Sequence, residues 1–109
     1  MSFKVLITSD FKRDSKSLLK KYKSLKAEIL ELITSLEEDP AQGTPLGNNC
    51  YKIRLAIASK GKGKSGGARV ITCAKVVNRF VYLLAIYDKG EKENISDNEL
   101  SELLKSIAE

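Results

Sequence analysis

Eight basic side chains and no carboxylate lie between residues 41 and 87 of this 109-residue chain. The chain contains no histidine, so Ser-His-Asp and Cys-His triads and histidine-containing metal sites are excluded. Without carboxylates in the central segment, a paired-carboxylate hydrolase is also disfavoured. Any catalysis must therefore use lysine, arginine, tyrosine, serine or threonine. The central basic residues are Lys52, Arg54, Lys60, Lys62, Lys64, Arg69, Lys75 and Arg79.

Several of these basic residues can meet on one surface of a sheet. Lys52 and Arg54 alternate with apolar residues, and the two-residue repeat of a strand puts both on one face. Arg69 begins the next predicted strand, so pairing of the two strands would gather the three cations. Such a patch can bind a nucleic-acid backbone or stabilise the added negative charge of a phosphorane-like transition state. The intervening loop adds Lys60, Lys62 and Lys64, which we predict to contact the RNA backbone; a solvated hairpin surface is the alternative.

Residues 58–65 (ASKGKGKS) nearly match the phosphate-loop pattern GxxxxGK[ST], with Ala58 in place of the first glycine. A true phosphate loop opens a helix, whose N-terminus holds the anion. Here the residues from Arg69 onward are strand-like, and no strand supplies an aspartate for magnesium. We therefore predict no nucleotide site at this loop.

The charge is divided unevenly along the chain. The formal net charge is +5, yet the segment from Asp88 onward holds seven acidic residues against three lysines. A basic middle beside an acidic end indicates a polyanionic ligand and an oppositely charged partner.

The two cysteines, Cys50 and Cys73, lack the spacing of a metal or disulfide framework, and core packing is the simpler interpretation. No segment approaches the ~20 apolar residues of a membrane span, and the first residues do not form a signal peptide. We expect a cytoplasmic protein with reduced thiols and no membrane contact.

The first half of the chain predicts a strand at residues 3–8, a helix at 11–22 capped by Ser9 and Asp10, and a second helix that Ser24 caps and Pro40 ends. The apolar stripe of this second helix is Leu25, Ile29, Leu32 and Leu36. These two helices form a hairpin. Residues 41–49 are rich in glycine, proline and asparagine and predict a loop.

Three strands and a helix are predicted to follow. The strands cover residues 51–58, 68–77 and 80–87, and the last, being almost continuously apolar, is expected in the centre of the sheet. Ser96 and Glu99 form the capping box of a final helix. This order predicts an α+β fold with an antiparallel sheet and the helices on one side, as one domain over residues 1–109.

Residues 51–54 (YKIR) and 67–71 (GARVI) resemble the central strands of RelE-type toxins of the RelE/ParE superfamily. The string KIRLAIASKGKGKSGGARVITCAKV is similar to the HigB-like branch, as is YLLAIYDKGEKENIS after it. The resemblance covers nearly the whole chain and implies the RelE-like fold of a type II toxin–antitoxin toxin. It implies an endoribonuclease that cuts mRNA in the ribosomal A site by attack of the ribose 2′-oxygen on the phosphate, without metal or cofactor. The implied partners are the ribosome, mRNA and an antitoxin, often of the helix-turn-helix type.

The resemblance assigns roles to five residues. Lys52 and Arg54 match the basic pair of the catalytic strand, and Arg69 matches the arginine that holds the scissile phosphate. Lys89 falls near the family's second arginine, and Tyr87 is the nearest aromatic residue for stacking or proton transfer.

The chain departs from the family pattern near its end. Many RelE toxins carry a tyrosine where this sequence reads ENIS at residues 93–96. A lysine with a lowered pKa, either Lys52 or a loop lysine, could serve as general base instead. Two alternatives stay open. The first is a non-enzymatic ParE-like gyrase poison of the same fold, although the YKIR and GGARV segments argue against it. The second is a plain RNA-binding module, although the sequence offers few exposed aromatic residues for stacking on bases.

Overall fold

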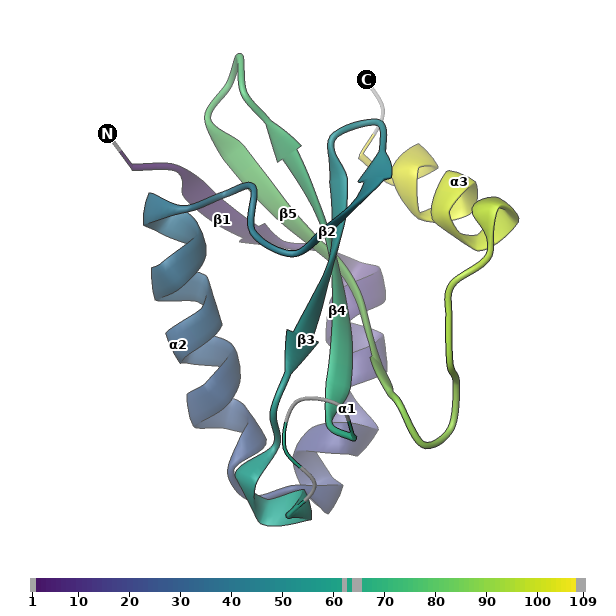
Figure 1. Cartoon of the computed structure of the whole chain (residues 1–109). Coiled ribbons are helices and arrows are strands. Elements are labelled where there is room, and N and C mark those ends of the chain that lie inside the picture. The colour runs from purple at the N-terminus through teal and green to yellow at the C-terminus, as the bar shows by residue number, and fades with distance from the viewer. Residues whose placement is uncertain (1, 62, 64–65, 108–109) are drawn as a thin grey trace.

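The computed structural model describes residues 2–61, 63 and 66–107. Within them a five-stranded sheet has the strand order β1-β5-β4-β3-β2 (Figure 1). The strands are β1 (Lys4–Ile7), β2 (Thr44–Gly47), β3 (Cys50–Leu55), β4 (Ala68–Lys75) and β5 (Phe80–Asp88). The helices are α1 (Ser9–Lys21), α2 (Leu25–Glu38) and α3 (Asp97–Lys105), with the short 3₁₀ turn η1 at Ala58–Lys60.

The predicted helical hairpin is present, but its caps differ from the prediction. Thr8, rather than Ser9 or Asp10, caps α1, because its side-chain oxygen accepts the N–H of Phe11 at 3.2 Å. Ser24 does occupy the position before α2, yet its hydroxyl donates to Glu28 Oε1 at 3.1 Å and accepts no backbone N–H of the helix. The helix ends at Glu38, before Pro40, because proline cannot continue a helix.

One face of the sheet is covered by α1 and α2. The predicted stripe of α2 is buried and packs in one core with the apolar residues of the strands. From the sheet this core takes Ile53 and Leu55 of β3, Val70 of β4, and Val81, Leu83 and Ile86 of β5. The alternation predicted for β3 is thus confirmed, since Ile53 turns toward the helices.

The opposite face carries α3, which corrects the expectation that all helices lie on one side (Figure 1). Leu100 of α3 packs in a second core with Cys50, Ile71, Cys73, Leu84 and Ala85. The continuous burial of β4 agrees with this, because side chains on both of its faces are buried and each face therefore needs a covering layer. The predicted capping box of Ser96 and Glu99 is present.

The sheet is antiparallel from β2 to β5, as predicted, whereas β1 pairs with β5 in parallel. β5 is an interior strand, and the middle position belongs to β4. β2 lies inside the segment predicted to be a loop. Gly43 and Gly47, which have positive φ, made this short edge strand look like a loop in the sequence. None of the helices in the described residues is long and apolar enough to cross a membrane.

A bulge in β5 decides which side chains share a face with α3. The register partner of Ile71 is Ala85 but that of Thr72 is Leu83, so Leu84 is the extra residue. Leu84 and Ala85 both join the α3 core, while Ile86 returns to the helical-hairpin core. Tyr87 consequently points to the same face as α3.

Candidate functional site

A row of three candidate functional side chains crosses the sheet on the face that carries α3. Arg54 of β3 is the register partner of Arg69 of β4, which is in turn the partner of Tyr87 of β5. Residues directly opposite in antiparallel strands have Cβ atoms about 4.5–5.5 Å apart. Lys52 lies two residues before Arg54, on the same face. The structure therefore brings together Lys52, Arg54, Arg69 and Tyr87, which we call the strand-face cluster.

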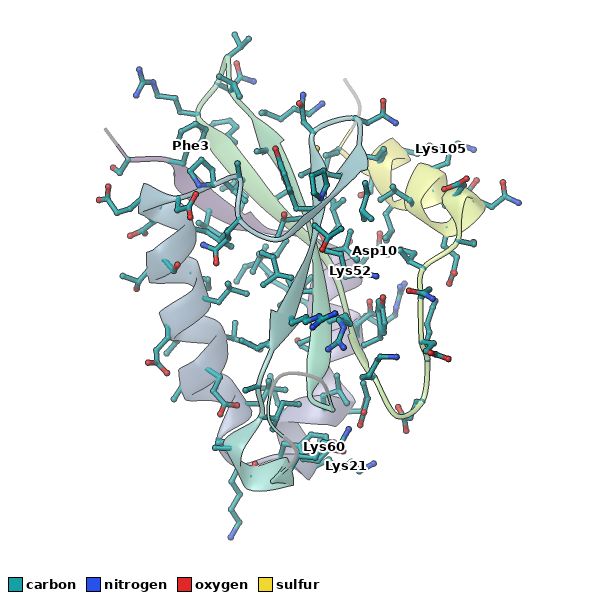
Figure 2. The ribbon with its side chains drawn as sticks, in the orientation of Figure 1. Phe3, Asp10, Lys21, Lys52, Lys60 and Lys105 are labelled. Atoms are coloured by element: carbon teal, nitrogen blue, oxygen red, sulfur yellow. The ribbon has the colours of Figure 1, made fainter. Side chains whose placement is uncertain are left out.

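The strand-face cluster places like charges opposite each other. Arg54 and Arg69 are direct partners, an arrangement that destabilises a sheet. Within the described part of the chain, no carboxylate lies at salt-bridge distance from Lys52 or Arg54. Lys52 Nζ instead donates to the neutral Asn94 Oδ1 at 3.1 Å, and Figure 2 shows Lys52 reaching toward the connection after β5. This surface keeps a positive charge suited to an anion.

The two arginines differ in exposure. Arg54 is exposed and, with Lys52, lines a shallow depression of about 260 Å³ beside Gly43 and Thr44. Arg69 is only 4% exposed, and its Nη1 donates to the carbonyl of Ala68 at 3.1 Å. Arg54 can therefore contact a ligand directly, whereas Arg69 supplies a positive charge just beneath the surface.

Tyr87 is the candidate proton donor of the site. Its hydroxyl is buried and has no hydrogen-bond partner among the described residues. Burial raises the pKa of Tyr87 above its usual value, against the opposing effect of Arg69 and with a smaller contribution from Glu99. Tyr87 is thus protonated at neutral pH, as a proton donor must be. It lines a cleft of about 390 Å³ together with Arg13, Lys92 and residues of α3.

The remaining predicted residues lie outside this row. Lys89 Nζ pairs with Glu93 at 3.3 Å, and its backbone N–H donates to the carbonyl of Gly67 at 3.0 Å. Lys60 is paired with Asp88 at 2.5 Å, away from Lys52 in Figure 2. The predicted RNA contacts of Lys62 and Lys64 lie outside the described residues.

Comparison with known proteins decides the family. A family model described as the RelE toxin of the RelE/RelB toxin–antitoxin system matches residues 3–109. The chain belongs to the RelE toxin family. It is therefore a toxin of a toxin–antitoxin system, as the resemblance in the sequence indicates, and the family implies an antitoxin as partner.

A solved structure gives the same fold. The E. coli toxin RelE, in the free state and as a mutant lacking two of its arginines, has a TM-score of 0.64 to this RelE-family chain at 17% sequence identity. The match covers 99% of this chain and 100% of that chain. At this identity the likeness establishes the α+β fold with its helical hairpin, sheet and C-terminal helix, and leaves the roles of individual residues to be proposed.

Sequence reasoning missed two groups near the site of this RelE-family toxin. Asn94, in the polar connection, accepts a hydrogen bond from Lys52. Asp88 receives the hydroxyl of Tyr22 and the ammonium group of Lys60. A signal for Asp88 was available, because it is a lone carboxylate directly after an apolar strand. Neither the hydroxyl nor the lysine that meets it could be identified from spacing.

Proposed function

We propose that this RelE-family toxin is a ribosome-dependent endoribonuclease that cleaves mRNA in the A site. The observation that carries the proposal is the cross-strand row of Arg54, Arg69 and Tyr87, which places the positive charge of two arginines beside a protonated hydroxyl. Transfer of a phosphoryl group needs both, because negative charge builds on the phosphate while the leaving oxygen must gain a proton.

The residues divide the work of the reaction. The ribose 2′-oxygen attacks the adjacent phosphorus and gives up its proton to a general base, for which Lys52, held by Asn94 Oδ1, is the candidate. Arg54 binds a phosphate oxygen, and the charge of Arg69 stabilises the transition state from below. The bond from phosphorus to the 5′-oxygen breaks as Tyr87 donates its proton to that oxygen. The products are a 2′,3′-cyclic phosphate and a 5′-hydroxyl.

Lys89 has a secondary role in this proposal. Its partner Glu93 is largely exposed, and an exposed ion pair of this kind contributes about 0–1 kcal/mol. A phosphate can therefore displace Glu93 at little cost. Lys89 then adds positive charge at the end of β5, next to Tyr87.

The proposed reaction also fixes the partners and place of the toxin. Its substrate is mRNA on the ribosome, so the toxin acts in the cytoplasm and without metal or cofactor. The antitoxin that the family implies is expected to be a helix-turn-helix protein, from the resemblance to the HigB-like branch.

The test is cleavage of a defined mRNA by the purified toxin, with and without programmed ribosomes, followed by mapping of the new ends. We expect cuts within the A-site codon only with ribosomes, and 5′-hydroxyl ends. An mRNA with a 2′-deoxyribose at the cut position is the matched control and should stay intact. Absence of cuts on ribosomes, with DNA damage on expression, would instead support the gyrase poison.

A further inference from the structure

A buried carboxylate stands at the end of β5, outside the proposed reaction. Asp88 is 3% exposed. Its Oδ2 accepts the hydroxyl of Tyr22 at 2.7 Å, and its Oδ1 accepts Lys60 Nζ at 2.5 Å and the backbone N–H of Gly90 at 2.8 Å. Three segments that are distant in sequence thus meet on one carboxylate: the end of α1, the turn η1 and the end of β5.

The two charges of this cluster are largely buried and neutralise each other. The side chain of Lys60 is 14% exposed, and its Nζ also lies 5.9 Å from the ring centroid of Tyr22. Burial alone would raise the pKa of Asp88, but the hydrogen bonds from Lys60, Tyr22 and Gly90 lower it below its usual value. Asp88 is therefore ionised at neutral pH, and Lys60 neutralises it. A buried ion pair is weak as a source of stability and better suited to fixing one geometry.

The turn η1 is itself fastened to the helical hairpin. The N–H of Ala58 donates to Glu28 Oε2 at 2.7 Å, and the N–H of Ser59 donates to the hydroxyl of Ser24 at 2.9 Å. Lys60 thus reaches Asp88 from a fixed base. This arrangement does not suit a lysine that follows an RNA backbone.

Asp88 also builds the turn after β5. Its carbonyl accepts the N–H groups of Glu91 and Lys92, both at 3.0 Å, and its carboxylate holds Gly90. The turn directs the polar connection back across the strand face. There Lys92 Nζ lies 5.6 Å from the ring centroid of Tyr87, and Asn94 receives Lys52.

We propose that Tyr22, Lys60 and Asp88 form a positioning cluster for the RNA-cleavage site. Lys60 acts on Asp88 rather than on RNA, and Asp88 holds the turn that brings Lys92 to the ring of Tyr87 and Asn94 to Lys52. This inference rests on the proposed function only for its effect on cleavage. Its effect on the turn itself is independent of any substrate.

The test uses three variants: Lys60→Met, Asp88→Asn and Tyr22→Phe. Lys105→Met is the control, because Lys105 pairs with Glu102 on an exposed surface. Amide hydrogen exchange of Gly90, Glu91 and Lys92 should quicken roughly tenfold in the three variants and stay unchanged in the control. The kcat of cleavage on ribosomes should fall roughly ten- to a hundredfold, with KM nearly constant, because the reacting groups are misplaced rather than lost.

Two further readouts separate positioning from RNA contact. If the residues act as a unit, the double variant Tyr22→Phe with Lys60→Met should lose less than the product of the single losses. If Lys60 instead binds a phosphate, Lys60→Met should raise KM and reduce the salt dependence of log KM by about 0.7.

A raised KM with a reduced salt dependence in Lys60→Met, or unchanged amide exchange in Tyr22→Phe, would overturn the positioning cluster. Tyr22→Phe removes only a hydroxyl, so it keeps the test decisive should the charge-altering variants fail to fold. A parent toxin that cuts no RNA would overturn the proposed function, and the exchange data would then decide the cluster alone.

Discussion

Two groups of cations in this toxin have similar sequence surroundings and opposite environments. Lys52, Arg54 and Arg69 gather on the strand face, where no carboxylate at salt-bridge distance offsets Lys52 or Arg54 within the described residues. Lys60, from the loop between the same strands, is bound to buried Asp88. In the first group, Lys52 and Arg54 keep a charge that no carboxylate of the described residues offsets at this distance, whereas in the second group the fold itself uses the charge of Lys60.

The difference teaches which charges can act on a ligand. A direct pair of arginines weakens a sheet, and Arg54 of this pair is exposed with no carboxylate at salt-bridge distance among the described residues, so it is suited to a bound anion. Lys60 with Asp88 is already compensated. Counting basic residues in the sequence cannot separate these cases, because the count does not include the partner that each charge meets.

The largest effect is expected for Arg69→Met, which keeps the volume and removes the charge. Cleavage on ribosomes should fall roughly 10²- to 10³-fold, as for loss of one transition-state contact. Lys75→Met is the matched control, because Lys75 lies on the same strand, exposed at its other end. Cleavage at the parental rate by folded Arg69→Met would break the distinction between the two groups.

Tyr87→Phe should reduce activity without reducing stability. The buried hydroxyl has no partner among the described residues, so its removal should leave the free energy of unfolding unchanged or raise it by about 1 kcal/mol. Cleavage should fall roughly 10- to 10²-fold with the loss of the proton donor. Denaturant unfolding and single-turnover cleavage measure the two effects, and a destabilised variant would show that Tyr87 is structural.

Asp88 should make the stability of the toxin sensitive to acid. Its pKa is lowered in the fold from a usual value of 3.8, so its contribution is present above that value and is lost as pH falls through the folded pKa. Each unit of lowering corresponds to about 1.4 kcal/mol. Urea unfolding as a function of pH should show a shallower acid loss in Asp88→Asn, and parallel curves for the two proteins would contradict the buried ion pair.

The smallest effect is expected for Glu93→Gln, which releases Lys89 from its exposed partner. Stability should change by less than about 0.5 kcal/mol, and KM should fall no more than about twofold because one more cation becomes available to the phosphate. Thermal unfolding and steady-state kinetics provide the comparison. A large loss of stability would mean that this pair, like Lys60 with Asp88, belongs to the fold.

Local patterns predicted the parts of the fold that repeat along the chain. The stripe of α2, the alternation of β3 and the capping box of α3 follow from residues within a few positions of one another. The parallel pairing of β1 with β5 was missed, because both alternation and apolar content are the same for either strand direction. β2 was hidden by Gly43 and Gly47, whose positive φ values make an edge strand resemble a loop.

The candidate site, too, has a part that local patterns predicted and a part that they did not. The two-residue repeat placed Lys52 and Arg54 on one face, and Arg69 joins them because its strand is the neighbour of β3. Lys60 was predicted to contact RNA, and its pairing with Asp88 could not be predicted, since Asp88 is distant in sequence and meets it only through the tertiary fold. Long-range pairs of this kind are set by packing and leave no periodic signal.

The most direct measurement is the position of the scissile phosphate in a cryo-electron microscopy structure of this toxin on a ribosome. The mRNA would carry a 2′-O-methyl group at the cut, which prevents cleavage. We predict the phosphate about 3 Å from the side-chain nitrogens of Arg54 or Lys52, on the Tyr87 side of the strand face, with Lys60 still on Asp88. A phosphate bound at Lys60, with the strand face empty, would contradict the proposed site.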